Sequence, residues 1–425
     1  MYYEKTLDNG IRIIGQKMPH LRSVSLGVWA GTGSVKEHDG EAGISHFIEH
    51  MLFKGTENRS AQKIAEEMDS IGAQLNAFTS KECTCFYAKT LDEQIDIAAD
   101  ILSDMVLHSV FDPQEMEKEK GVVVEEINMS EDTPEDVAME LLSATYFGKD
   151  APHGKPILGT RDSVRGFSRE DILSYMDRHY RENNLLLAVA GSFDENKIEE
   201  LAHKYFGRKG SDIPLEPYPV PKSPQGVRFA SAEKDIEQCH IAIAMPAFGP
   251  QDPNYYPMMV LNNALGGSMS SRLFQVIREQ NGMAYSVYSF NSAYKDTGSL
   301  GIYAGTGAST AKSVLSLIIE ELDKVKNHGI TEEEFIRSRG QLRGSYILGN
   351  ESPGARMNAI GKNKLLYGNV RSEEEVIRDI ENVTMEKVNE LAKQVLITDN
   401  IAVAVVGKTN GMREELSKLT GASLS

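Results

Sequence analysis

Two histidines and a glutamate occur in the order His46-x-x-Glu49-His50, and no helix breaker lies between Ile44 and Lys54. On a helix, the two histidines project from the same face about one turn apart, so both imidazoles can reach one Zn²⁺ ion. Glu49 is offset from this pair and is placed to take a proton from a water at the metal. The pattern indicates a hydrolytic zinc site. A helix whose two histidines pair with carboxylates or cap a groove remains the alternative.

A catalytic zinc site needs a third protein ligand and an open position. The best candidate is Glu126, on a helix predicted to begin at Asp112-Pro113, where a cap is followed by proline at the first helical position. Glu119 lies two turns earlier on the same stripe and is expected to orient a ligating histidine. Glu125 is the alternative ligand, but its side chain should point about 100° away from that stripe. The segment is rich in glutamates, and most of them should be solvated.

Short strands alternate with helices in the segments that must position these side chains. In the first half we expect strands at residues 23–31, 74–80, 83–90 and 184–191, and helices that start near Gly43, Ser60, Leu91, Pro113 and Ser168. The second and third strands are separated by two residues only, which implies a hairpin and antiparallel pairing. The sequence therefore predicts an α+β fold, with helices packed on one face of a mainly antiparallel sheet.

The chain also repeats itself. Helix starts at Ser168 and Thr384 are each followed by an apolar run that ends in glycine, at Gly191 and Gly407, and both pairs are 216 residues apart. Collinear matches of this kind indicate duplication. Residues 211–226 hold 5 of the 15 prolines, which predicts an extended linker. We expect two homologous domains, residues 1–210 and 227–425, joined by this linker.

The segment HFIEHMLFKGT closely resembles the metal-binding motif of the insulinase/pitrilysin family, whose H-x-x-E-H signature is that of the inverted zincins. The match is closest to the mitochondrial processing peptidase β-like branch and its short bacterial relatives, and it covers nearly the whole chain. The resemblance implies zinc bound by His46, His50 and Glu126, with Glu49 as general base and Glu119 in support. It also implies two domains that face each other across a cleft and a zinc endopeptidase acting on unfolded peptides.

The same resemblance implies substrate contacts away from the metal. Residues 76–88 are similar to the family's substrate-binding edge strand, which places Asn76, Ala77 and Phe78 beside an extended peptide. Core packing is the alternative for Phe78. Residues 274–289 resemble the segment with which the second domain contacts substrate, and the matching positions are Arg278 and Tyr285. An interdomain ion pair plus a buried tyrosine is the alternative for these two.

The second half carries no zinc motif of its own. Its aligned positions hold Met259, Asn262 and Asn263 in place of the two histidines and the glutamate, and Ser345 stands opposite Glu126. One active site per chain is therefore expected.

The composition disfavours several other classes of function. The chain has 45 basic and 62 acidic residues, a net charge of −17, which repels phosphate backbones and makes nucleic acid an unexpected partner. No stretch approaches 18 apolar residues, so no membrane span is expected. The start lacks the pattern of a signal peptide, and three cysteines fit reduced thiols, which together suggest a cytoplasmic protein.

Two other functions compete with hydrolysis. The family includes non-catalytic subunits of processing and respiratory complexes, and a metal-binding scaffold without hydrolysis would also carry the histidine pair. Non-catalytic members usually lack a ligand or the base, whereas this chain retains all four residues. Related short proteins pair, so a homodimer is compatible with the resemblance.

Overall fold

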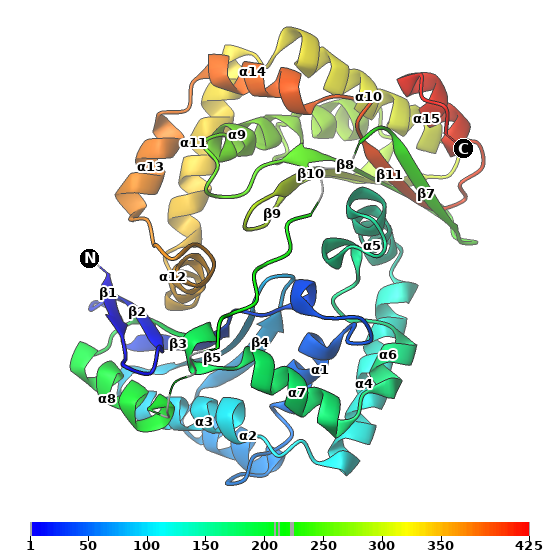
Figure 1. Ribbon diagram of the computed structural model, residues 1–425. Coiled ribbons are helices and arrows are strands. Elements are labelled where there is room, and N and C mark those ends of the chain that lie inside the picture. The colour runs from blue at the N-terminus through cyan, green and yellow to red at the C-terminus, as the bar shows by residue number, and fades with distance from the viewer. Residues whose placement is uncertain (1, 208–209, 211–212, 222–224, 425) are drawn as a thin grey trace. The chain divides into compact units, whose positions relative to one another are not determined.

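The computed structural model describes residues 2–207, 210, 213–221 and 225–424. The chain forms two compact units. The first comprises Met1–Ile127, Pro156–Pro219 and Leu348–Ser372, and the second comprises Asn128–Lys155, Val220–Ile347 and Glu373–Ser425. Each unit contains one β-sheet with helices packed on it (Figure 1). The predicted α+β fold is confirmed.

The sheet of the first unit has six strands in the order β1-β2-β6-β3-β5-β4. All neighbouring strands are antiparallel except β2 and β6, which are parallel. The strands are β1 (Tyr3–Thr6), β2 (Arg12–Lys17), β3 (Ser23–Ala30), β4 (Gln74–Thr79), β5 (Thr84–Leu91) and β6 (Leu185–Gly191). The helices are α1 (Ile44–Met51), α2 (Ala61–Ser70), α3 (Ile95–His108), α4 (Pro113–Asp132), α6 (Arg161–Gly166), α7 (Arg169–His179), α8 (Glu195–Phe206) and α12 (Pro353–Tyr367). The last five residues of α4 belong to the second unit.

The sheet of the second unit has the order β7-β11-β8-β10-β9. Its one parallel pair, β7 with β11, occupies the same place as β2 with β6 in the first sheet. This shared topology supports the predicted duplication. The strands are β7 (Arg228–Glu233), β8 (Gln238–Ala247), β9 (Ala284–Ala293), β10 (Gly298–Gly307) and β11 (Ala402–Gly407). The helices are α5 (Pro134–Phe147), α9 (Tyr255–Leu265), α10 (Ala311–His328), α11 (Glu332–Gly349), α13 (Glu373–Glu381), α14 (Met385–Val395), α15 (Met412–Thr420) and the π-helix η5 (Phe274–Gln280).

The units differ from the two contiguous domains that the sequence predicted, because each sheet is covered on one face by a helix from the other half of the chain. In the first unit α12 packs on β2, β3 and β6, and in the second α5 packs on β7, β8 and β11 (Figure 1). Residues 128–155 therefore belong to the second unit and residues 348–372 to the first. The expected linker at 211–226 lies partly outside the described residues, and its described part has no helix or strand.

Buried apolar side chains explain why α12 belongs to the first unit. Trp29 of β3 packs against Met357 and Ile360 of α12, and its indole nitrogen lies 3.4 Å from the Met357 sulfur. A Cβ atom at Gly361 would lie 2.5 Å from the Trp29 ring, so only glycine permits this close approach. The other face of the same sheet packs on α1, α3, α7 and α8. This second core is the one that positions the histidines.

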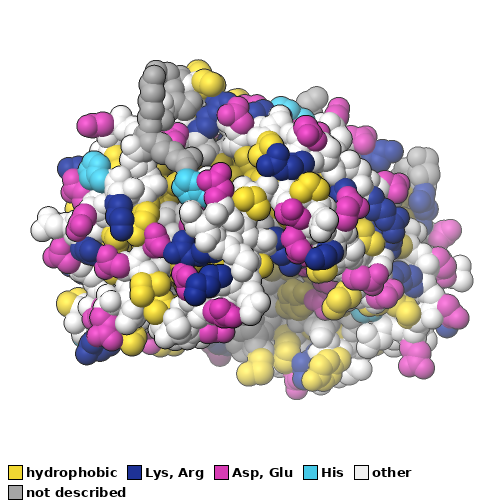
Figure 2. Space-filling view, turned by 90° about the horizontal axis from the view of Figure 1, so that it is seen from below, with side chains coloured by type: hydrophobic (Ala, Val, Ile, Leu, Met, Phe, Trp, Pro, Cys, Tyr) yellow, Lys and Arg dark blue, Asp and Glu magenta, His cyan; other side chains and the backbone are white. Residues whose placement is uncertain are grey.

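Two properties of the structure concern the membrane span and the nucleic-acid partner that the sequence disfavoured. None of the described helices is both long and apolar enough to cross a membrane. On the face shown in Figure 2, acidic side chains are interspersed with lysine and arginine.

Candidate metal centre

Helix α1 presents its histidines because its other face is fixed in the core. Ile44, Phe47, Ile48 and Met51 are buried in the main core of the first unit. His46, Glu49 and His50 occupy the remaining face. Helix α1 ends at Met51, although the sequence has no helix breaker before Lys54. The helical placement of the motif agrees with the prediction.

The first turn of α1 is held by a remote carboxylate. Its N-cap residue, Gly43, has a φ of 88° and no side chain with which to cap the helix. Glu37 takes this role, since its two carboxylate oxygens accept the backbone N–H groups of Gly43 at 2.9 Å and of Ser45 at 3.0 Å. Burial raises the pKa of Glu37 to about 7, against the lowering effect of these hydrogen bonds.

Three side chains converge where the sequence placed a metal. One ligand atom each from His46, His50 and Glu126 lies within 4.8 Å of the others, and no other such group occurs among the described residues. One oxygen of Glu126 lies 3.4 Å from Nε2 of His50 and 3.7 Å from Nε2 of His46. Ligands at about 2.1 Å from a tetrahedral zinc ion lie roughly 3.4 Å apart, so these residues fit the ion. Glu125 is exposed, as expected for a residue that turns away.

The protonation states of these groups determine what a metal must displace. Burial, together with the smaller effect of the neighbouring His50, lowers the pKa of His46 to about 4, so His46 is neutral at physiological pH. Burial also lowers the pKa of His50, but the hydrogen bonds with Glu119 and Glu126 outweigh it and raise the value to about 9. The hydrogen bond from His50 lowers the pKa of Glu126. Because a ligating imidazole is neutral, a bound metal must displace the proton of His50.

Glu119 lies behind the histidine pair. It is 4% exposed, and its Oε1 lies 2.8 Å from Nδ1 of His50. With Nδ1 engaged in this way, Nε2 of His50 is directed toward Glu126. Nδ1 of His46, by contrast, is buried without a hydrogen-bond partner among the described residues. Only His50 thus has a carboxylate of the kind expected to orient a ligating histidine.

Glu49 is held by a residue that the sequence did not single out. Thr79 Oγ1 donates a hydrogen bond to Glu49 Oε2 at 2.5 Å. Burial raises the pKa of Glu49, and the hydrogen bond from Thr79 opposes this effect. Thr79 is the last residue of β4, which is the edge strand of its sheet. A threonine on an edge strand gives no signal of its own, so sequence reasoning missed it.

The other predicted substrate residues divide between the two faces of β4. Asn76 is exposed, Ala77 packs against the core that includes α1, and Phe78 contacts Trp29 edge-on with ring centroids 5.5 Å apart. Phe78 is partly buried against the α12 side of the sheet. Its contacts therefore favour the core-packing alternative, whereas Asn76 is free of such packing.

Arg278 and Tyr285 lie together in the second unit. The guanidinium of Arg278 stacks between the rings of Phe274 and Tyr285, at 4.8 and 4.7 Å from their centroids, and donates to the backbone oxygen of Tyr285 at 2.9 Å. Tyr285 is 78% exposed, which contradicts the alternative of a buried tyrosine. On α9, the side-chain amide of Asn263 donates a hydrogen bond to Gln341 at 2.6 Å. No metal-ligating group is found among the described residues of this unit.

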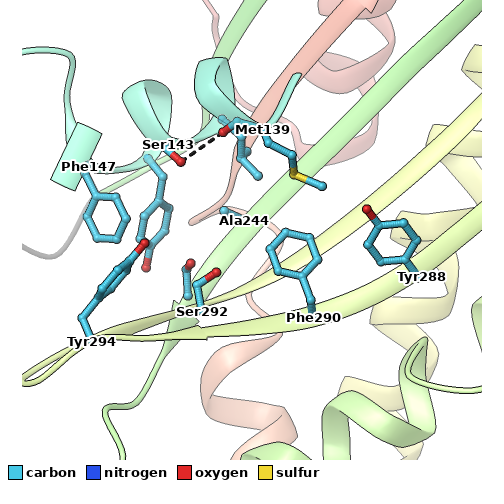
Figure 3. Close-up of a pocket in the computed structure, with 11 residues that line it drawn as sticks. Met139, Ser143, Phe147, Ala244, Tyr288, Phe290, Ser292 and Tyr294 are labelled. Carbon is cyan, nitrogen blue, oxygen red and sulfur yellow. Dashed lines mark hydrogen bonds between the residues drawn. The ribbon is translucent and has the colours of Figure 1, made fainter. Parts of the chain in front are cut away.

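A separate cavity of about 280 Å³ lies in the second unit between α5 and the β9–β10 hairpin (Figure 3). Five of its eleven lining residues are aromatic, and Figure 3 shows Phe147 and Tyr294 next to each other, with Phe290 further along the cavity. Its eleven lining residues include serine and tyrosine hydroxyls but no carboxylate, imidazole or thiol. This cavity is therefore not a candidate metal site.

The comparisons with known proteins cover both halves of the chain. The model of the insulinase family, peptidase family M16, matches residues 12–161, and the model described as the peptidase M16 inactive domain matches residues 166–342. A protein of Bacillus subtilis (strain 168) named as an uncharacterized zinc protease is 43% identical over 410 residues, which are 96% of this chain and 98% of that protein.

Solved structures share the fold. The chain is similar to a protease from Helicobacter pylori, with a TM-score of 0.89 and 20% identity over 96% of this chain and 99% of that one. It is equally similar to a peptidase M16 inactive domain from Pseudomonas fluorescens, with a TM-score of 0.89 and 18% identity over 96% of this chain and 98% of that one. At such identities the likeness establishes the architecture alone.

Proposed function

The chain belongs to the insulinase family of peptidases, family M16, and from this premise we propose that it is a zinc-dependent endopeptidase that hydrolyses unfolded peptides. The observation that carries the proposal is the convergence of His46, His50 and Glu126 beside Glu49. Family membership alone would not distinguish a peptidase from a non-catalytic relative. The narrower placement in the processing-peptidase β-like branch stays a prediction.

Zinc is the cofactor, in keeping with the name of the Bacillus subtilis relative. His46, His50 and Glu126 would hold the ion, and they leave a fourth position open. When bound, the ion supplies Lewis acidity that polarises the scissile carbonyl and makes water a nucleophile near neutral pH.

Glu49 carries out the proton transfers as general base and then general acid. Its carboxylate accepts a proton from the attacking water and returns it to the leaving amine. Thr79 holds one oxygen of this carboxylate, which leaves the other free to accept the proton. Because Thr79 belongs to the edge strand β4, the same strand that binds an extended peptide by backbone pairing also orients the base.

The predicted roles of Arg278 and Tyr285 are kept as part of the proposal. Their stacking leaves the Tyr285 side chain exposed, so its hydroxyl can contact a substrate. A tyrosine hydroxyl at the reacting carbonyl would stabilise the oxyanion. Of the edge-strand residues, Asn76 and Ala77 are proposed to lie beside the peptide.

A quenched unfolded peptide assayed with the wild type and Glu49→Gln tests the function, with bound zinc measured in both proteins. The proposal expects about one zinc per chain in each and cleavage by the wild type only. Equal cleavage by the variant would exclude Glu49 as the base. Zinc in the wild type without cleavage of any unfolded peptide would instead support a scaffold or a non-catalytic subunit.

A further inference from the structure

Glu119 uses both of its carboxylate oxygens, and the two partners differ in kind. Oε1 meets Nδ1 of His50 at 2.8 Å, while Oε2 meets Nζ of Lys54 at 2.6 Å. A charged carboxylate as buried as this one is costly unless it is paired and hydrogen-bonded. These contacts lower the pKa of Glu119, against the raising effect of burial. Lys54 is thus part of the environment that keeps Glu119 charged.

Lys54 reaches Glu119 because of the way the chain leaves α1. After Met51 the backbone turns, with hydrogen bonds from the N–H of Phe53 to the oxygen of His50 and from the N–H of Lys54 to the oxygen of Met51. The Lys54 side chain then lies against Glu119 with 31% of its surface exposed. His50 and Lys54, which contact the two oxygens of the Glu119 carboxylate, are therefore only four residues apart in the sequence.

We propose that Lys54 is a positioning residue of the metal centre, holding the Glu119 carboxylate in the orientation that directs Nε2 of His50 at the metal. The inference rests on the proposed function in one respect, namely that His50 is a zinc ligand. Lys54 itself contacts neither the histidines nor Glu126 in the ion pairs of the described residues. It acts through Glu119 alone.

The consequence of removing the cation follows from the geometry. With only the His50 contact left, the carboxylate can rotate about its last bond, and the hydrogen bond to Nδ1 no longer has a fixed direction. Outer partners of metal-ligating histidines typically contribute 10–100-fold to metal affinity. Lys54 lies one step further out, so we expect about a tenfold loss when its charge is removed without loss of its length.

The test compares three variants of the full chain by zinc affinity, measured by competition with a chromogenic chelator. Lys54→Met removes the charge, and Lys54→Arg keeps it. Lys118→Met is the matched control, since Lys118 makes an ion pair of the same 2.6 Å length with Glu115 on the same helix, α4, but away from the histidines. Thermal unfolding of each apo protein separates a general loss of stability from a loss specific to zinc.

We expect about a tenfold weaker zinc affinity for Lys54→Met, near wild-type affinity for Lys54→Arg, and no change for Lys118→Met. The inference is overturned if Lys54→Met binds zinc as tightly as Lys118→Met. It is also overturned if arginine fails to restore the affinity, because a positioning cation should be replaceable. If the wild type binds no zinc, the proposed function is contradicted as well. If the wild type binds zinc and Lys54→Met binds it equally tightly, this inference alone is contradicted.

Discussion

Replacing Thr79 by valine should impair hydrolysis mainly at acidic pH. Thr79 donates a short hydrogen bond to Glu49, at 2.5 Å, and this bond opposes the rise in the pKa of Glu49 that burial causes. Valine has nearly the same shape and suits a strand, so β4 should keep its structure. The variant therefore removes the donor without moving the carboxylate's other surroundings.

The size of the effect follows from the energy of the lost bond. A hydrogen bond to a charged group contributes about 1.5–3 kcal/mol, which corresponds to a factor of roughly ten or more in the ionisation equilibrium. A general base works only when ionised, so its lost ionisation lowers kcat/KM wherever the pH is below the pKa of Glu49. At higher pH the carboxylate ionises in spite of the missing donor, and the rate should recover.

The assay is a profile of kcat/KM against pH, from about pH 5 to 9, on a quenched peptide, with zinc measured in parallel. Thr79→Val should lose about tenfold on the acidic limb, Thr79→Ser should restore it, and zinc content should stay at the wild-type value. An acidic limb that coincides with that of the wild type would refute the role of Thr79. A uniform loss at every pH would point to a displaced carboxylate instead.

Four further outcomes are expected. Glu126→Gln should weaken zinc binding by about 100-fold in chelator competition, whereas Glu125→Gln should leave it unchanged, because only the former faces the histidines. The stability of Glu37→Gln relative to the wild type should rise with pH, by about 3 kcal/mol from pH 5 to pH 8 in urea unfolding. Burial raises the pKa of Glu37 to about 7, so the wild-type carboxyl loses its stabilising contribution over this range. A difference in unfolding free energy that does not change with pH would contradict this. Met357→Ala should cost about 2–5 kcal/mol in urea unfolding with zinc affinity retained, since it opens a cavity beside the indole on the far face of the sheet. Tyr285→Phe should lower kcat by about tenfold with unchanged zinc content, and an unchanged rate would remove this hydroxyl from the mechanism.

Local patterns made much of this structure predictable. The i, i+4 spacing of His46 and His50 places two imidazoles together on any helix, and the cap at Ser168 predicted a helix that indeed begins at Arg169 with a capping box. The third ligand is different, because it lies 76 residues after His50. No local rule brings Glu126 to the histidines. Its place on the same helix stripe as Glu119 made it the best candidate, and the resemblance to a family placed the third ligand on it.

What the sequence did not reveal depends on packing between distant segments. The stripe of Ala138, Leu142 and Tyr146 on α5 shows that one face is buried, but not that it is buried against β8 and β11. Thr79 and Lys54 likewise matter only because the fold brings them to Glu49 and Glu119. Such contacts have no period or spacing that a sequence could display.

Anomalous diffraction at the zinc absorption edge, from crystals grown with stoichiometric zinc, tests the central claim most directly. One strong peak per chain is expected, within about 2.0–2.2 Å of Nε2 of His46, Nε2 of His50 and a carboxylate oxygen of Glu126. No peak among these three side chains, or a peak that Glu126 does not contact, would contradict the assignment of this cluster as the metal centre.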